Sequence, residues 1–189
     1  MLRLSVVILA VALCSDIPAS ATSYPPVTFN ELVTRADAIF IGEVTDVRPF
    51  LLPTRDGTIV KTRVIFRVSD PIFGTTSSLE VFDFFGGELG DVGMAIAGMP
   101  RFAVGDRRVV FARRDRSINP IVGFTQGLLR ITRDSAGVDR VFTSDGVPLG
   151  RPESIGARSP GVSVTPISPM RLSEFRDRVN GALAEARRR

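Results

Sequence analysis

The chain has 189 residues, of which 44% are hydrophobic, so it can bury the core of one domain with short extensions. Its formal net charge is +4, but Lys61 is the only lysine, and such an arginine bias is more typical of a GC-rich genome than of a nucleic-acid-binding surface. Histidine is absent, and the only cysteine, Cys14, lies in a segment that we expect to be removed. These absences exclude Ser-His-Asp and Cys-His nucleophiles, zinc fingers and zinc proteases, because those sites are made from imidazole and thiolate.

Residues 1–21 have the pattern of a secretory signal peptide. Arg3 supplies the charged start, residues 4–13 form an apolar run too short to span a bilayer, and Ala19-Ser20-Ala21 fits an A-x-A cleavage site. A lipoprotein signal that uses Cys14 is the alternative, although a leucine precedes this cysteine where a lipobox carries a small residue. Cleavage after the A-x-A site would give an exported chain, periplasmic or secreted, without disulfides.

Capping and hydrophobic spacing predict the first two elements of the mature chain. Thr28 and Glu31 fit a capping box, which predicts a helix over about 28–36. The apolar run that follows predicts a strand over 38–47, in which Gly42 marks a bulge or a tight bend. The helix side chains expected in the core are Phe29, Leu32 and Val33.

A hairpin and two more strands are predicted next. Asp56-Gly57 carries a hairpin signal, and residues 58–69 alternate between apolar and polar side chains, as expected of a half-buried strand. A turn is predicted over 70–74 and a third strand over 79–85. The side chains expected on the buried face of the second strand are Val60, Thr62, Val64, Phe66 and Val68.

Four further strands are predicted, over 107–112, 118–124, 128–132 and 138–142. Turn signals separate them at the short spacing that is typical of a small barrel or sandwich. With the preceding strands they indicate an antiparallel barrel of about five to seven strands.

We divide the mature chain into a β-barrel domain over 22–145, a loosely ordered linker over 146–169 and a C-terminal helix within 170–189. Proline, glycine and serine are frequent in the linker. The helix is predicted over about 170–186 from one apolar stripe. The residues of this stripe are Met170, Leu172, Phe175, Val179 and Leu183.

The segment between the third and fourth predicted strands is rich in glycine, which allows positive φ and close backbone approach. Such density indicates a loop with a specified path. We interpret it as a surface that presents Met94, Ile96 and Met99 to a partner, because flexible thioethers suit adaptable contacts. The alternative is that these three side chains cover one end of the barrel as a plug. The residues predicted at the partner contact are Gly86, Gly87, Met94, Ile96, Met99, Pro100 and Arg101.

Two chemistries remain open to a chain without histidine. Paired carboxylates can hydrolyse glycosidic bonds, and Asp83, Glu88 and Asp91 cluster in and beside the loop. Loop carboxylates are more often solvated or bonded to backbone N–H groups, and the spacing of these three does not match known calcium loops. A Ser-Lys dyad would need Lys61, which lies in mid-strand without S-x-x-K spacing. We therefore predict no catalytic residue, no cofactor and no metal site.

A basic strand face beside phenylalanines is what a single-strand binder needs. Lys61, Arg63 and Arg67 lie on one face of the strand predicted over 58–69. The phenylalanines, however, fall mostly on apolar strand faces and are expected in the core. We therefore predict no nucleic-acid partner and keep a nucleic-acid or polysaccharide binder as an alternative.

Several short motifs occur in a fairly specific order between about residues 28 and 133. They include Arg35-Ala36-Asp37-Ala38-Ile39-Phe40-Ile41-Gly42-Glu43-Val44, Thr62-Arg63-Val64-Ile65-Phe66-Arg67-Val68, Gly86-Gly87, Gly98-Met99-Pro100-Arg101-Phe102 and Gly123-x-x-Gln126-Gly127. This order resembles that of a family of exported, uncharacterised bacterial proteins. The resemblance implies export but no particular reaction.

The order of motifs is also distantly similar to the netrin-like module of tissue inhibitors of metalloproteinases, a five-stranded OB-type barrel with flanking helices. This resemblance implies an OB-like, netrin-like antiparallel barrel here, and a co-exported matrixin-type metalloprotease as a partner. Those inhibitors ligate the catalytic zinc through an N-terminal cysteine, whereas Thr22 would begin the mature chain here. The resemblance therefore bears on the fold more than on that mechanism.

The sequence thus predicts a mainly β, OB-like exported monomer with a short N-terminal helix, a C-terminal helix and no stable membrane insertion. Its predicted function is non-enzymatic: a binding or accessory module that presents residues 86–101 to a protein or envelope partner. A carboxylate-dependent glycan hydrolase is the alternative from another class.

Overall fold

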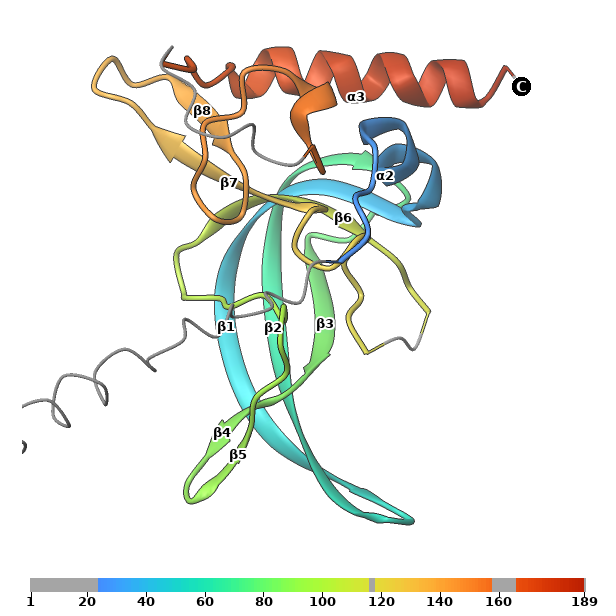
Figure 1. The fold of residues 1–189 in the computed structure, drawn as a ribbon, viewed down its shortest axis with the longest axis vertical. Helices are drawn as coiled ribbons and strands as arrows, with labels where there is room; N and C mark the ends of the chain where they lie inside the picture. The colour runs from blue at the N-terminus through green and yellow to red at the C-terminus, as the bar shows by residue number, and fades with distance from the viewer. Residues whose placement is uncertain (1–23, 116–117, 158–165, 189) are drawn as a thin grey trace, which may run out of the picture.

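The computed structural model describes residues 24–115, 118–157 and 166–188, so the predicted signal peptide, with Cys14, lies outside the described residues. The fold is mainly β, with a short helix near the N-terminus and a longer C-terminal helix, as predicted (Figure 1). None of the described helices is both long enough and apolar enough to cross a bilayer. The elements are α2 (Phe29–Arg35), β1 (Ala38–Thr54), β2 (Gly57–Phe73), β3 (Leu79–Phe85), β4 (Gly87–Leu89), β5 (Val92–Met94), β6 (Arg107–Ala112), β7 (Leu128–Arg133), β8 (Asp139–Phe142), η1 (Pro152–Ser154) and α3 (Leu172–Ala186).

Six strands form one antiparallel sheet in the order β3-β2-β1-β6-β7-β8, and β4 pairs with β5 in a separate two-stranded sheet. The long strands β1 and β2 curve strongly and extend as a hairpin beyond the rest of the sheet (Figure 1). Within the described part of the chain, strand pairing runs from β3 to β8 without joining these two ends. Closure into an OB-like or netrin-like barrel therefore stays a prediction.

Helix α2 begins at the capping box that the sequence predicts. The Thr28 hydroxyl accepts a hydrogen bond from the Glu31 N–H at 3.2 Å, and the Glu31 carboxylate accepts one from the Thr28 N–H at 2.9 Å. These bonds satisfy two groups that a helix start would otherwise leave unpaired. The side chains expected in the core are buried, namely Phe29, Leu32 and Val33.

Strands β1 and β2 are both longer than predicted. The β1–β2 register shifts between Ile41 and Gly42, as expected of a bulge at this glycine. The turn predicted over 70–74 is wrong, because β2 continues through Pro71 to Phe73, and the chain turns only at Gly74. Since β3 pairs with β2 no further than Arg67, this end of β2 is an edge where proline disrupts no ladder bond.

The strand predicted over 118–124 is also wrong. In that range Ile121 alone forms a bridge, to Ala112, and residues 122–127 form turns. Gly123 and Phe124 adopt positive φ values of 64° and 61°, which a strand does not allow. The Asn119 side chain also accepts a hydrogen bond from the Ile121 N–H, a local bond that competes with strand pairing.

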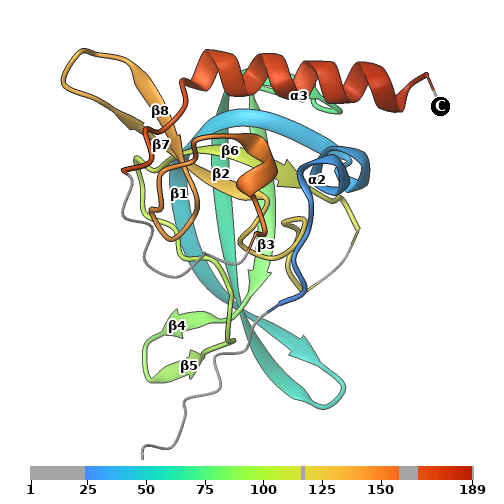
Figure 2. The same cartoon turned by 45° about the horizontal axis from the view of Figure 1, so that its top comes forward.

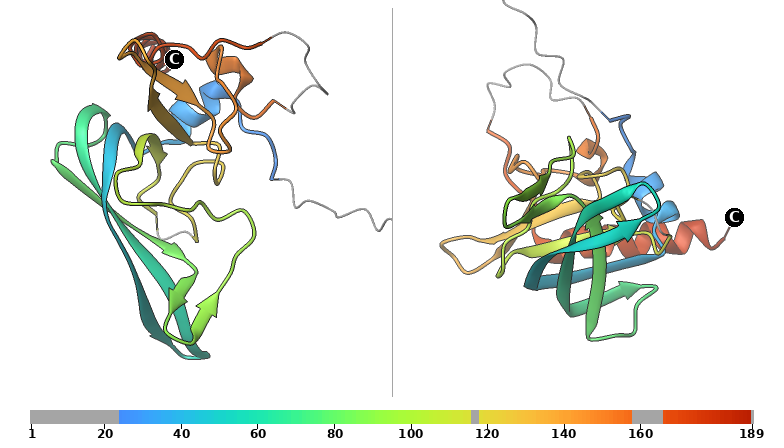
Figure 3. Two further views of the ribbon diagram at one scale, coloured as in Figure 1. Left: turned by 90° about the vertical axis from the view of Figure 1, so that its left-hand side faces the viewer. Right: turned by 90° about the horizontal axis from the view of Figure 1, so that it is seen from below.

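The sheet carries a hydrophobic core on each of its faces. On one face α2 and α3 pack together over β1, β6, β7 and β8 (Figure 2). The centre of the Phe175 ring lies 5.9 Å from that of Phe29 and 6.3 Å from that of Phe111. On the other face, segments between β3 and β7 pack over β1, β2, β3 and β6. The first face is covered only in part, because the left panel of Figure 3 shows the surface of β1–β2–β3 below the helices left bare. We call these the helix core and the loop core. Large buried side chains of the loop core are Phe40, Phe66, Phe82 and Phe84.

Part of the predicted linker contributes to the helix core. Leu149 and Ile155 are buried there, and the Leu149 N–H donates to the Val141 carbonyl while the Leu149 carbonyl accepts from the Met170 N–H. Residues 158–165 of the range lie outside the described residues, so the division into domain, linker and helix stays a prediction. The apolar stripe of α3 is buried at Phe175, Val179 and Leu183, while Met170 is buried just before the helix begins.

Candidate functional site

The glycine-rich segment leaves β3 through two glycines that fasten it to β2. The Gly86 N–H donates to the Val60 carbonyl at 2.8 Å, and the Thr62 hydroxyl donates to the Gly86 carbonyl at 2.7 Å. Gly87 adopts a φ of +133°, and a Cβ at this residue would lie 2.4 Å from the Thr62 hydroxyl oxygen. A side chain would therefore collide with β2, so this close contact requires glycine.

Beyond Gly87 the segment, which the sequence predicts to be a loop, forms a hairpin. Gly87–Leu89 of β4 pairs with Val92–Met94 of β5, and Gly90 turns the chain with a φ of +59°. Leu89 is 40% exposed and Val92 is 49% exposed. In Figure 1 this hairpin lies at the same end of the molecule as the tip of the β1–β2 hairpin, away from the helices. We call Leu89–Val92 the hairpin tip.

The second half of the segment packs onto the loop core. Met99 and Phe102 contact this core, and the Phe102 ring lies 4.8 Å from Phe84. The Tyr24 hydroxyl donates to the Ala97 carbonyl, so the start of the described chain also holds this half in place. One half of the segment therefore covers the core and the other half projects from it, while contact with a partner stays a prediction.

The predicted contact residues are consequently spread over both halves. Gly86 and Gly87 join the hairpin to β2, Met94 and Ile96 are partly buried, and Pro100 is buried. Arg101 is exposed, and Met99 is partly buried against the loop core. Sequence reasoning missed Leu89 and Val92, although the Gly90-Asp91 pair between two apolar residues is a hairpin signal that could have identified them.

The three carboxylates considered for hydrolysis have separate surroundings. Asp83 accepts two hydrogen bonds from the Arg63 guanidinium, at 2.8 and 2.9 Å, across the β2–β3 ladder. Glu88 and Asp91 are exposed on the β4–β5 hairpin. No group of three acidic, histidine or cysteine side chains in the described ranges is placed to hold a metal ion.

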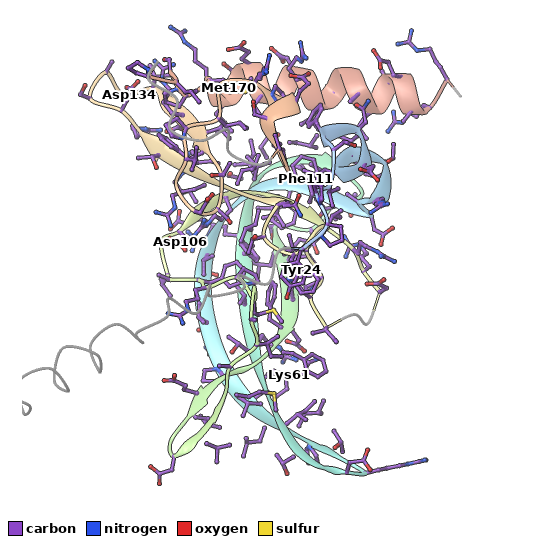
Figure 4. All side chains as sticks on the ribbon, in the orientation of Figure 1. Tyr24, Lys61, Asp106, Phe111, Asp134 and Met170 are labelled. Atoms are coloured by element: carbon purple, nitrogen blue, oxygen red, sulfur yellow. The ribbon has the colours of Figure 1, made fainter. Side chains whose placement is uncertain are left out.

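Two of the phenylalanines outside the cores lie on the bare surface of β1–β2–β3. The Lys61 ammonium lies 4.7 Å from the centre of the Phe85 ring, and the Arg63 guanidinium lies 5.2 Å from that of Phe50. Figure 4 shows Lys61 in the lower half of the molecule, far from the helices. The expectation that phenylalanines fill the core is confirmed for most of them, but these two form cation–aromatic pairs at the surface.

Two hollows lie near the helix end of the molecule. One, of about 370 Å³, is lined in part by Asp70, Asp139 and Arg176, and the other, of about 310 Å³, by Asp134 and Arg140. Both contain ion pairs, Arg176 with Asp70 and Arg140 with Asp134, each at 2.8 Å. Neither hollow is lined by the segment 86–101.

Asp139 carries the strongest electrostatic perturbation described. Hydrogen bonds from Arg107, and to a smaller extent from Arg133, hold the pKa of this carboxylate well below its usual range. Burial acts in the opposite direction and raises the pKa, but its effect is smaller. Arg107 contributes two bonds of 2.8 Å, and Arg133 contributes bonds of 2.9 and 3.3 Å. The arrangement keeps Asp139 ionised and joins β6, β7 and β8, which is a structural role.

No family model, curated protein sequence or solved structure matches this chain. The resemblances to an exported bacterial family and to the netrin-like module therefore stay predictions.

Proposed function

We propose that this protein is an exported, monomeric and non-enzymatic binding module that contacts a protein partner through the β4–β5 hairpin. The proposal rests on the construction of this hairpin. It is closed by its own ladder, fastened to β2 through Gly86 and Gly87, and ends in the exposed apolar side chains Leu89 and Val92.

A fastened hairpin suits binding because little conformational entropy remains to be lost when a partner docks. Leu51 and Leu52 near the end of β1 are also exposed, at 44% and 39%, and the β1–β2 hairpin reaches the same end of the molecule (Figure 1). Exposed apolar side chains gathered at one end of a molecule favour a protein contact. Within this proposal Met94 and Ile96 support the tip, while Met99 and Pro100 fix its base.

The netrin-like resemblance makes a co-exported metalloprotease the first partner to test. A glycan hydrolase is less well supported, because Asp83 is paired with Arg63, and Glu88 and Asp91 are exposed on the hairpin. A second binding function, for a polyanion such as a nucleic acid or an acidic polysaccharide, is favoured by the Lys61–Phe85 and Arg63–Phe50 pairs on the bare strand surface.

The proposal can be tested by affinity capture from the envelope and medium of the source cell, with three baits. One bait is the parent protein, one carries Leu89→Asp and Val92→Asp, and one carries Leu79→Asp and Val81→Asp. Leu79 and Val81 are 49% and 50% exposed on the bare surface of β3, so they match the tip residues in chemistry and exposure.

A partner retained by the parent and by the β3 variant, but lost from the hairpin variant, is the expected result. Loss from the β3 variant alone would contradict the hairpin proposal and favour the polyanion surface. Circular dichroism of all three baits establishes that none has lost its fold.

A further inference from the structure

Arg108 is a charged residue enclosed in the loop-core side of the sheet. Its side chain is 3% exposed, and its Nη2 donates to Asp106 at 2.7 Å. Its Nε is buried without a hydrogen-bond partner. A guanidinium offers five N–H donors, and buried donors without acceptors are costly, so this residue has unused hydrogen-bonding capacity in an enclosed place.

A second arginine lies directly opposite. Arg108 of β6 pairs with Arg130 of β7, and Arg130 is exposed. Because side chains alternate along strands, both point to the face that carries Val110 and Leu128 of the loop core. Like charges directly opposite each other on neighbouring strands are unfavourable unless a negative charge lies between them.

Asp106 supplies a negative charge beside Arg108 and Arg130. It accepts bonds from Arg108 and, at 3.1 Å, from the Ala103 N–H. Burial raises its pKa, but these bonds and the charges of Arg108 and Arg130 outweigh burial and hold the pKa below its usual value. Two cations therefore share one anion, and the cluster keeps one positive charge in excess.

The strand neighbours on either side of the two arginines are uncharged. Gly42 of β1 pairs with Arg108 and is covered by the Phe40 ring, which lies 3.1 Å from the position that a Cβ would take, and Phe142 of β8 pairs with Arg130. Figure 4 places Asp106 at the flank of the sheet, apart from the β4–β5 hairpin. The cluster is thus separate from the surface proposed for the protein partner.

We propose that Arg108 and Arg130, with Asp106 as their shared counter-charge, form a binding site for a small tetrahedral oxyanion of the phosphate or sulfate type. The anion reaches the site from the solvent side, where Arg130 is exposed, and accepts hydrogen bonds from both guanidinium groups. Planar guanidinium forks match oxyanions in geometry, and such bonds are among the stronger ones in proteins. Asp106 holds Arg108 in position through its hydrogen bond.

The test is a titration of the purified protein with inorganic phosphate at constant ionic strength, followed through the arginine Nε–Hε signals in ¹H–¹⁵N spectra. The Arg108 signal is expected to shift and to saturate. Arg130→Gln should weaken the apparent affinity by at least about tenfold, whereas Arg67→Gln, at an exposed arginine of β2, should leave it unchanged. Arg130 is exposed, so its replacement does not threaten folding.

Two further arms distinguish the source of the anion. Sulfate and glycerol 3-phosphate are titrated in the same way, and tighter binding of the phosphomonoester would assign the site to a phosphate group on a larger molecule. Tighter binding of the inorganic ions would assign it to a free anion. An Arg108 signal that does not saturate with any of the three, or an equal loss in Arg67→Gln, would overturn the proposal.

Discussion

At Gly74 the chain turns out of β2 with a φ of +68°, and a Cβ there would lie 1.8 Å from the carbonyl oxygen of Asp37. Gly137 has a similar φ of +77° but no atom within 4 Å of the same position. Gly137→Ala should therefore lower the unfolding free energy by about 1 kcal/mol, the cost of holding alanine at a positive φ. Gly74→Ala should lower it by about 3 kcal/mol or more, because its Cβ would also collide with the backbone. Urea denaturation measures both, and equal losses would contradict the close packing of Gly74 on α2–β1.

Asp139 makes stability depend on pH. Its pKa in the folded protein lies below that of an unfolded aspartate, which is about 3.9, because Arg107 and Arg133 donate to the carboxylate. Its contribution is therefore complete above about pH 5 and is lost as the pH falls toward the folded-state pKa. Asp139→Asn should lower the unfolding free energy at pH 7 by about 1–3 kcal/mol and flatten the profile between about pH 5 and pH 2. A variant with the parent slope would show that these bonds do not stabilise the fold.

At the level of elements, the β4–β5 hairpin depends on the contact of Gly87 with β2. Gly87→Ala places a Cβ against Thr62, whereas Gly90→Ala adds one in open space at the turn of the same hairpin. Hydrogen exchange should accelerate over residues 86–94 in Gly87→Ala much more than in Gly90→Ala, with the core strands little changed. Similar exchange in the two variants would mean that the fastening at Gly87 does not order the hairpin.

Elements with strong local signals could be predicted from the sequence, and those set by tertiary contacts could not. The capping box fixed the start of α2, and alternation identified the buried face of β2. The continuation of β2 through Pro71 was missed because it depends on where β3 stops pairing. The strand over 118–124 was wrongly predicted because the apolar residues there lie mostly in turns and form only one bridge. Within the candidate site the sequence singled out Gly86 and Gly87, but it did not identify Leu89 and Val92 as exposed, since exposure depends on which half of the segment covers the core.

For the whole molecule, one sheet is shared by two cores, so the cores should unfold together. Phe175→Ala empties the centre of the helix core and should cost about 3–5 kcal/mol. Tyr24, the only tyrosine in a chain without tryptophan, stacks on Phe124 and reports by fluorescence on the region near the loop core. The unfolding transition followed by Tyr24 fluorescence should coincide with the one followed by circular dichroism, both in the parent and in the variant. Separate transitions would show that the helix core melts independently.

Residue-specific photo-crosslinking in the source cell can show whether the hairpin tip is the binding surface. A photoreactive amino acid replaces Val92 at the tip or, as a control, Ala136 in the exposed turn between β7 and β8. We expect one discrete crosslinked partner from position 92, absent from position 136 and lost when Gly87→Ala is added. No product at position 92, or the same products from both positions, would contradict it.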